Sequence, residues 1–114
     1  MSINEFLETL KASPEAIDFD ILMALIDANY IFTPCAFSNG DLQNKAGENS
    51  GSCKLFYFAK LQDLSEADTL ACFGAYYRED VLKNPDGDNH QNIRNFIKYG
   101  WQGVKFEAEA LTNI

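Results

Sequence analysis

Apolar side chains recur at helical spacing near the start of the chain. Ser2 and Glu5 have the spacing of a capping box, and the apolar positions at 6, 7 and 10 predict a short helix over residues 3–11. A second helix is predicted over residues 20–28, where nearly every position is apolar. Because a helix that is apolar all round has no face for water, this second helix is expected to be buried.

Residues rich in β-formers and residues typical of turns follow. Residues 29–38 carry aromatic and β-branched side chains, and Pro34 within them forces a bend or an edge position because it lacks a backbone N–H. Residues 39–52 are polar, with three glycines and three asparagines. This pattern predicts a strand-forming segment followed by a long surface loop.

Two further helices are predicted in the centre of the chain. Residues 53–61 fit a strand or a helix by periodicity, and the helix is favoured, with Ser50 or Ser52 as its N-cap. A helix over residues 65–83 has apolar positions at spacings of three, four and four residues. Its buried face is expected to consist of Leu70, Phe73, Tyr77 and Val81.

The last predicted helix is followed by a closing strand. Asp88 or Asn89 is the expected N-cap of this helix, and Gly100 ends it. Apolar and charged residues alternate within residues 103–108, which predicts a strand. We therefore predict an α+β fold: a single compact domain of four to five short helices packed on a small β-sheet formed by residues 29–38 and 103–108.

The balance of charge excludes two classes of partner. The 114-residue chain has 9 basic and 17 acidic residues, a formal net charge of −8, and no segment with a cluster of positive charge. Nucleic-acid-binding proteins need such a cluster, and anionic membrane surfaces repel an acidic protein. We therefore expect neither nucleic acid nor a membrane surface as a partner.

The sequence shows no membrane or export segment of the common kinds. The longest apolar run, residues 21–26, is far shorter than the ~20 residues of a spanning helix. The N-terminus has neither the basic start nor the apolar core of a signal peptide. We expect no transmembrane segment and no signal peptide, and we place the protein in the cytosol of the cell that makes it.

Cysteine and histidine are too few for a standard structural zinc site. Cys35, Cys53 and Cys72 are an odd number of thiols without a Cys-x-x-Cys pair, and His90 is the single histidine. Carboxylates at positions 86 and 88 precede His90 in an oxygen-rich turn, but turn formation and helix capping account for them. We predict free thiols, no metal and no cofactor.

Three residues are candidates for catalysis. Cys53 lies in the first turn of a predicted helix, where the helix dipole lowers the pKa of a thiol, and His90 is available as its base. Asp80 is a second candidate base. Each has a structural alternative, a buried cysteine or a charged group on a solvated helix face. The sequence leaves this choice open and does not establish whether the protein is an enzyme.

A segment rich in Gly and Ser is a candidate anion site. Backbone N–H groups at a helix N-terminus can hold an anion, and Ser50, Gly51, Ser52 and Lys54 stand where the helix over residues 53–61 is expected to begin. The spacing of Gly51 and Lys54 differs from that of a Walker A loop. The alternative is an ordinary surface loop that ends in a serine cap.

Four blocks of the sequence are similar to one known family. The first comprises residues 26–30, 32–34, 36–37 and 39–40, and the others are 49–54, 73–82 and 90–96. Taken in order, these blocks resemble the HopJ type III effector family. The resemblance spans nearly the whole chain, so residues 1–114 are expected to form one HopJ-like domain.

The resemblance implies an effector without assigning it a reaction. The family is named for a protein that the type III secretion system of plant-pathogenic bacteria delivers, and it supplies no catalytic residues to carry over to this chain. It therefore implies a Gram-negative source, secretion into a host cell and action by binding a host protein.

The alternative is a cytosolic enzyme, or a protein that binds a small ligand or a metal, with a polar pocket from residues 76–94. The candidate ligand-binding residues for such a pocket are Asn29, Tyr76, Arg78, Asp80, His90 and Arg94.

Overall fold

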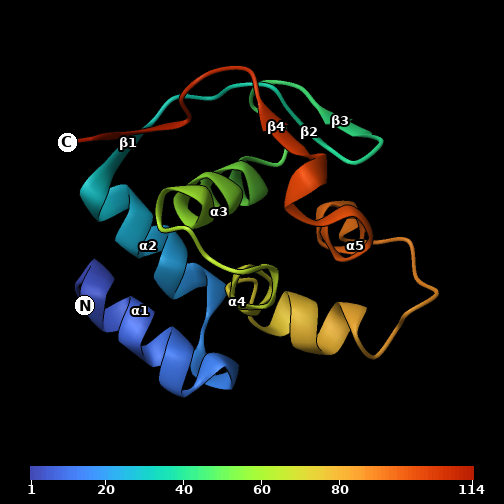
Figure 1. Ribbon diagram of the computed structural model, residues 1–114, viewed down its shortest axis with the longest axis horizontal. Coiled ribbons are helices and arrows are strands. Elements are labelled where there is room, and N and C mark those ends of the chain that lie inside the picture. Colours follow the sequence, from blue (N-terminus) through green and yellow to red (C-terminus); the bar gives the residue numbers. More distant parts are fainter.

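The computed structural model describes residues 1–114 as five α-helices, two 3₁₀ turns, one π-helix and five short strands (Figure 1). The α-helices are α1 (Ile3–Ala12), α2 (Phe19–Asn29), α3 (Ser50–Leu61), α4 (Glu66–Ala71) and α5 (Gln91–Tyr99). The 3₁₀ turns are η1 (Pro14–Ala16) and η3 (Gly100–Gly103), and the π-helix is η2 (Tyr76–Val81). The strands are β1 (Tyr30–Phe32), β2 (Phe37–Asn39), β3 (Leu42–Asn44), β4 (Val104–Phe106) and β5 (Leu111–Asn113). The predicted α+β class is confirmed.

Helix α3 lies at the centre of the core. Figure 1 shows the strands along one side of α3, with the other helices around its remaining sides. Phe56 and Phe58 on this helix are fully buried. The ring of Phe56 lies 6.3 Å from Phe37, 5.5 Å from Phe73 and 5.0 Å from Phe96, between ring centroids. Such aromatic contacts join the strands, α4 and α5 to one helix.

The strands form two antiparallel sheets rather than the single sheet that was predicted. One sheet has the order β3-β2-β4, and the other pairs β1 with β5. The two sheets separate at Pro34, because proline has no backbone N–H to donate to a strand hydrogen bond. On either side of it, Thr33 bonds to Ala110 and Ala36 bonds to Glu107. Strand β5 was not predicted, because a strand of three residues is too short to show an alternation of apolar and polar side chains.

The predicted surface loop over residues 39–52 is wrong in its first part. Gly40 makes a tight turn with a φ of +63°, and strand β3 then runs back along β2. Asn39 and Asn44 are buried at 0% and 3% exposure. Polar residues therefore lie inside the protein here, because both amides donate hydrogen bonds to the Asn92 side chain on α5.

The predicted continuous helix over residues 65–83 is also wrong. Helix α4 ends at Ala71, and Gly74 breaks the path with a φ of +63° before the π-helix begins. A Cβ at Gly74 would lie 3.1 Å from both the Ile17 oxygen and the Phe19 nitrogen, so the break is imposed by close packing on the segment before α2. Of the expected buried face, Leu70, Phe73 and Val81 are buried and Tyr77 is partly buried.

The starts of the helices differ in a way that matters for the site. Ser2, Asp18 and Ser65 cap α1, α2 and α4 with side-chain hydrogen bonds. Helices α3 and α5 begin at Asn49 and His90, both in the left-handed region with φ of +50° and +52°, and neither side chain caps its helix. The predicted caps were therefore wrong at Ser50, Ser52, Asp88 and Asn89.

No helix in the fold combines the length and the apolar character needed to cross a membrane.

Candidate functional site

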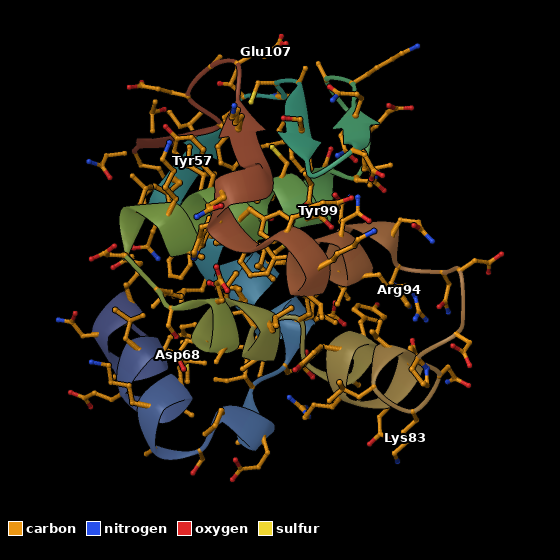
Figure 2. All side chains as sticks on the ribbon, turned by 45° about the vertical axis from the view of Figure 1, so that its right-hand side comes forward. Tyr57, Asp68, Lys83, Arg94, Tyr99 and Glu107 are labelled. Carbon is orange, nitrogen blue, oxygen red and sulfur yellow. The ribbon has the colours of Figure 1, made fainter.

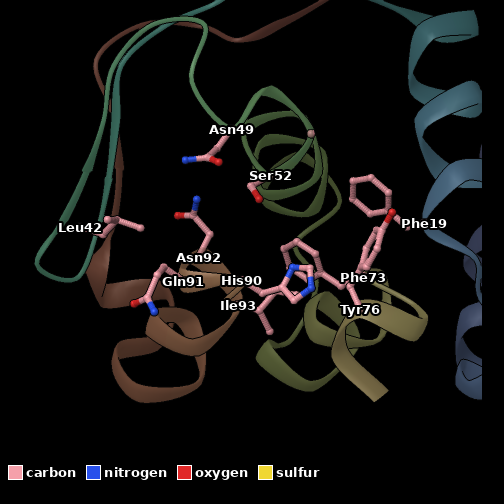
Figure 3. A pocket seen from close by; sticks show the side chains of 11 residues that line it. Phe19, Leu42, Asn49, Ser52, Phe73, Tyr76, His90, Gln91, Asn92 and Ile93 are labelled. Atoms are coloured by element: carbon pink, nitrogen blue, oxygen red, sulfur yellow. The ribbon is translucent and has the colours of Figure 1, made fainter. Parts of the chain in front are cut away.

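A cavity of about 510 Å³ opens between the first turns of α3 and α5 (Figure 3). This volume lies within the range of small-molecule pockets. Helix α2, strand β3, the residues between α4 and the π-helix, and the π-helix itself complete its wall. The cavity therefore brings together segments from distant parts of the sequence.

The polar wall of the cavity consists of two helix N-termini. Gly51 and Ser52 come from the first turn of α3, and Gln91 and Asn92 come from the first turn of α5. The backbone N–H groups of these four residues have no acceptor in the protein. Because free N–H groups and the helix dipole both make a helix N-terminus positive, two positive helix ends meet at this wall.

A network of buried amides supports this wall from behind. The Asn92 side chain accepts from the amides of Asn39 and Asn44 at 3.1 and 3.3 Å, and it donates to the Asn44 oxygen at 3.0 Å. The Asn49 amide donates to the same Asn44 oxygen at 2.7 Å. The network ties the start of α3 and the start of α5 to the β2–β3 hairpin, so the two helix ends are held in place relative to each other.

His90 stands at the mouth of the cavity and is held from two sides. Its Nε2 lies 3.0 Å from an Asp80 carboxylate oxygen, and its ring lies 5.2 Å from the Tyr76 ring between centroids. Tyr76 and Asp80 are four residues apart on the π-helix, so one element supplies both contacts. The imidazole and carboxylate side chains are 30% and 47% exposed, and His90 is charged when it is protonated.

The cavity wall carries no fixed charge. None of its residues is acidic, although the chain has 17 acidic residues, and none is Lys or Arg. Phe19, Phe73 and Ile93 supply an apolar part of the wall, and Leu42 of the β2–β3 hairpin lies at another edge. The site therefore offers hydrogen-bond donors and apolar surface, and its titratable side chains are His90 and Tyr76.

The two arginines predicted to bind ligand are engaged in structural contacts. Arg78 donates to carbonyl oxygens within residues 14–17, at 3.5 and 3.1 Å, and so ties the π-helix to η1. Arg94 donates to the carbonyl oxygens of Asn84 and Asn89 at 2.8 and 2.6 Å, and it holds the loop before α5 (Figure 2). Neither side chain lines the cavity.

Two other predicted residues also lie elsewhere. The Asn29 amide donates to the Leu25 oxygen at 2.8 Å at the end of α2. Lys54 pairs with Asp27 at 2.9 Å and lies 5.0 Å from the centre of the Phe32 ring. Of the predicted anion-binding residues, Gly51 and Ser52 line the cavity, whereas Ser50 and Lys54 do not.

The cysteines are buried free thiols that do not line the cavity. Cys53 lies in the first turn of α3 as expected, but burial, with a smaller effect of the neighbouring Cys35, raises its pKa to about 12. Burial, with a smaller effect of Asp68, raises the pKa of Cys72 to about 12. The dipole effect expected for Cys53 is therefore outweighed by desolvation, and its predicted pairing with His90 is replaced by the contact of His90 with Asp80.

No group of three or more His, Cys, Asp or Glu side chains converges in the fold in a way that could hold a metal ion. The carboxylates at positions 86 and 88 do not form such a group with His90.

Sequence reasoning found part of this site. Tyr76, Asp80 and His90 were proposed together and are brought together. Asn49 and Asn92 were missed, because their roles depend on a hairpin that the sequence did not reveal. The signal that pointed to them was the set of sequence blocks itself, since residues 49–54, 73–82 and 90–96 all contribute to the cavity.

The chain is similar to one known family and to one solved protein structure. The family described as HopJ type III effector protein matches residues 3–111. The crystal structure of VPA0580, a protein of unknown function, is 54% identical, with a TM-score of 0.98 over 100% of this chain and 95% of that chain. No curated protein matches the sequence.

Proposed function

The chain belongs to the HopJ type III effector family, and from the geometry of its cavity we propose that it binds a small molecule through an acidic group, a carboxylate or a phosphate. The observation that carries this proposal is the convergence of two helix N-termini without side-chain caps on one cavity. Helix N-termini are common anion sites because their free N–H groups point at the ligand.

The charges around the cavity support an acidic ligand. A chain with a net charge of −8 repels anions at long range, but that repulsion is screened over about 8 Å in physiological salt. At short range the wall holds no carboxylate, and it offers the backbone N–H groups of α3 and α5 together with His90.

The arrangement supports binding without identifying a reaction. The thiols lie outside the cavity, and burial keeps Cys53 and Cys72 protonated. The contact with Asp80 fixes the orientation of the His90 ring. An oriented ring suits a residue that forms a hydrogen bond with a ligand. We therefore assign the cavity a binding role.

A titration with inorganic phosphate tests the proposal. Amide resonances of the first turns of α3 and α5 are expected to shift together in NMR spectra as phosphate is added. The variant Ser52→Asp places a carboxylate on the wall at a helix position that favours acidic residues, so it should abolish binding without loss of stability. The variant Ser52→Asn is the neutral control and should still bind.

The proposal fails if these amides stay unperturbed up to high millimolar phosphate, or if Ser52→Asp and Ser52→Asn bind equally. Either result would mean that the helix ends do not form an anion site.

Family membership supports a second proposal, that a type III apparatus delivers the protein into a host cell, where it binds a host protein. A translocation reporter fused to the full chain tests delivery, with a strain that lacks a working type III apparatus as control. A signal that persists in that strain contradicts delivery. A host partner would be captured from host extract on the full chain. If the Ser52→Asp variant no longer captured that partner, the partner would bind at the cavity.

A further inference from the structure

We infer that the acidic ligand also carries a flat aromatic ring, and that this ring packs on Tyr76 at the mouth of the cavity. This inference rests on the proposed anion site and names the class of molecule that would occupy it. It follows from the apolar part of the wall, which the helix N-termini do not explain.

An aromatic wall faces the cavity beside the polar one (Figure 3). Phe19 lies 6.1 Å from Phe73 in a stacked arrangement and 5.4 Å from Tyr76 in an edge-to-face arrangement, between ring centroids. His90 continues the row, 5.2 Å beyond Tyr76. The four rings come from α2, the segment between α4 and the π-helix, the π-helix itself and the residue before α5, and together they form one surface.

This surface is only partly covered by protein. Phe73 is only 2% exposed, so other residues of the protein already cover its ring. Tyr76 is 41% exposed, although its ring contacts Phe19 and His90. A flat ring that stacked on Tyr76 would remove this apolar area from water and gain an aromatic contact.

The size of the cavity favours a ligand larger than a simple anion. A phosphate ion would leave most of the 510 Å³ open to water. Ligand pockets of this size are lined mainly by apolar and aromatic side chains, with a few polar groups that fix orientation. Here the polar groups are the helix ends, and the aromatic wall lies next to them.

Charge gives an independent reason for the ring. No Lys or Arg lines the wall, so an acidic group gains no ion pair with a permanent cation. Without an ion pair, we expect apolar contact to contribute much of the binding free energy. The exposed aromatic surface offers such a contact. The expected ligand class is therefore a small aromatic acid, with the acidic group at the starts of α3 and α5 and the ring on Tyr76.

Three probes separate the parts of this inference: inorganic phosphate, phenol and phenyl phosphate. Binding of each to the full chain is measured by NMR titration. We expect phenyl phosphate to bind at least about tenfold more tightly than phosphate, because the ring adds one aromatic contact and its buried area. Phenol, which lacks the acidic group, should bind more weakly than phenyl phosphate.

Variants at Tyr76 assign the gain to the aromatic wall. Tyr76→Leu should remove most of the advantage of phenyl phosphate over phosphate, whereas Tyr76→Phe should keep that advantage. Tyr99→Leu is the matched control, because Tyr99 is 37% exposed and lies outside the cavity.

The outcomes are distinguishable. Equal affinities for phosphate and phenyl phosphate overturn the aromatic inference while the anion site stands. The same holds if Tyr76→Leu changes nothing. Failure of both phosphate and phenyl phosphate to bind overturns the anion site and the inference together. Phenol binding as tightly as phenyl phosphate overturns the acidic part.

Discussion

The buried amide network makes a quantitative prediction about Asn92. Replacing Asn92 by Ala removes three side-chain hydrogen bonds, one with Asn39 and two with Asn44. Each partner keeps another bond: Asn39 donates to the Asn92 backbone oxygen at 2.8 Å, and the Asn44 oxygen still accepts from Asn49. Because the groups that lose a bond to Asn92 each keep another partner, the loss should be about 1 kcal/mol per bond, or about 3 kcal/mol in total.

Urea unfolding followed by the fluorescence of Trp101 measures this loss. Trp101 is a good reporter because its ring packs 5.1 Å from Phe96 on α5 and its Nε1 donates to Leu64 at 3.0 Å. A thermal melt gives a second measurement. A loss of about 1 kcal/mol lowers the melting temperature of a domain of this size by about 4 °C, so that of Asn92→Ala should fall by about 12 °C.

The variant Asn95→Ala is the matched control for Asn92→Ala. Asn95 also bonds to the hairpin, through the Asn39 oxygen and Asp41, but it is only partly buried and water can replace its bonds. Its loss should be about 1 kcal/mol or less. A loss below about 1 kcal/mol for Asn92→Ala, or equal losses for the two variants, would refute the idea that buried amides hold the two helix ends together.

Three further predictions concern other parts of the fold. Gly74→Ala should cost about 2 kcal/mol in urea unfolding, because a left-handed backbone and a tight Cβ contact both oppose a side chain there, and an unchanged midpoint would contradict this. Iodoacetamide at about pH 8 should leave Cys53 and Cys72 unmodified in the native protein, because burial raises both pKa values to about 12. The unfolded protein should react. Mass spectrometry measures the labelling, and modification of either cysteine in the native protein would contradict the prediction. The hydrogen bonds from Ser2 lower the pKa of Glu5, so the stability that Glu5 contributes is present above its unfolded pKa and is lost as the pH falls through the lowered folded value. Thermal melts between about pH 6 and pH 3 should therefore show a smaller decrease for Glu5→Gln, which has no carboxyl group to titrate, than for the wild type, and equal decreases would contradict the assignment.

Features that depend on neighbouring residues were predictable from the sequence. The pattern over residues 3–11 and 20–28 gave α1 and α2 within a residue or two of their bounds, because an apolar stripe and a cap are local signals. The end of α5 at Gly100 was predictable for the same reason, since that glycine has a φ of +66°.

Features that depend on distant packing were not predictable. Nothing near Gly74 in the sequence shows that the backbone of Ile17 and Phe19 passes within contact distance and breaks the helix there. The hairpin within residues 39–44 was read as a loop because its polar residues are satisfied by α5, some fifty positions later. Polar composition predicts exposure unless the partners are known.

The same distinction applies to the candidate site. The contact of His90 with Asp80 spans ten residues and a turn, so the sequence could suggest it. Arg78 and Arg94 looked equally suited to a ligand, but backbone carbonyl oxygens occupy both. Such acceptors carry no sequence signature, because every residue has one.

The pairing of β1 with β5 has a consequence for how the chain reaches this fold. It joins positions 79 to 83 residues apart, and β1 has no other strand partner. A contact between such distant residues closes a large loop, whose entropy must be lost before the contact stabilises anything. We expect this sheet to form late in folding, after α3 has gathered the aromatic core. During synthesis, the edge of β1 therefore stays unpaired until residues 111–113 have been made.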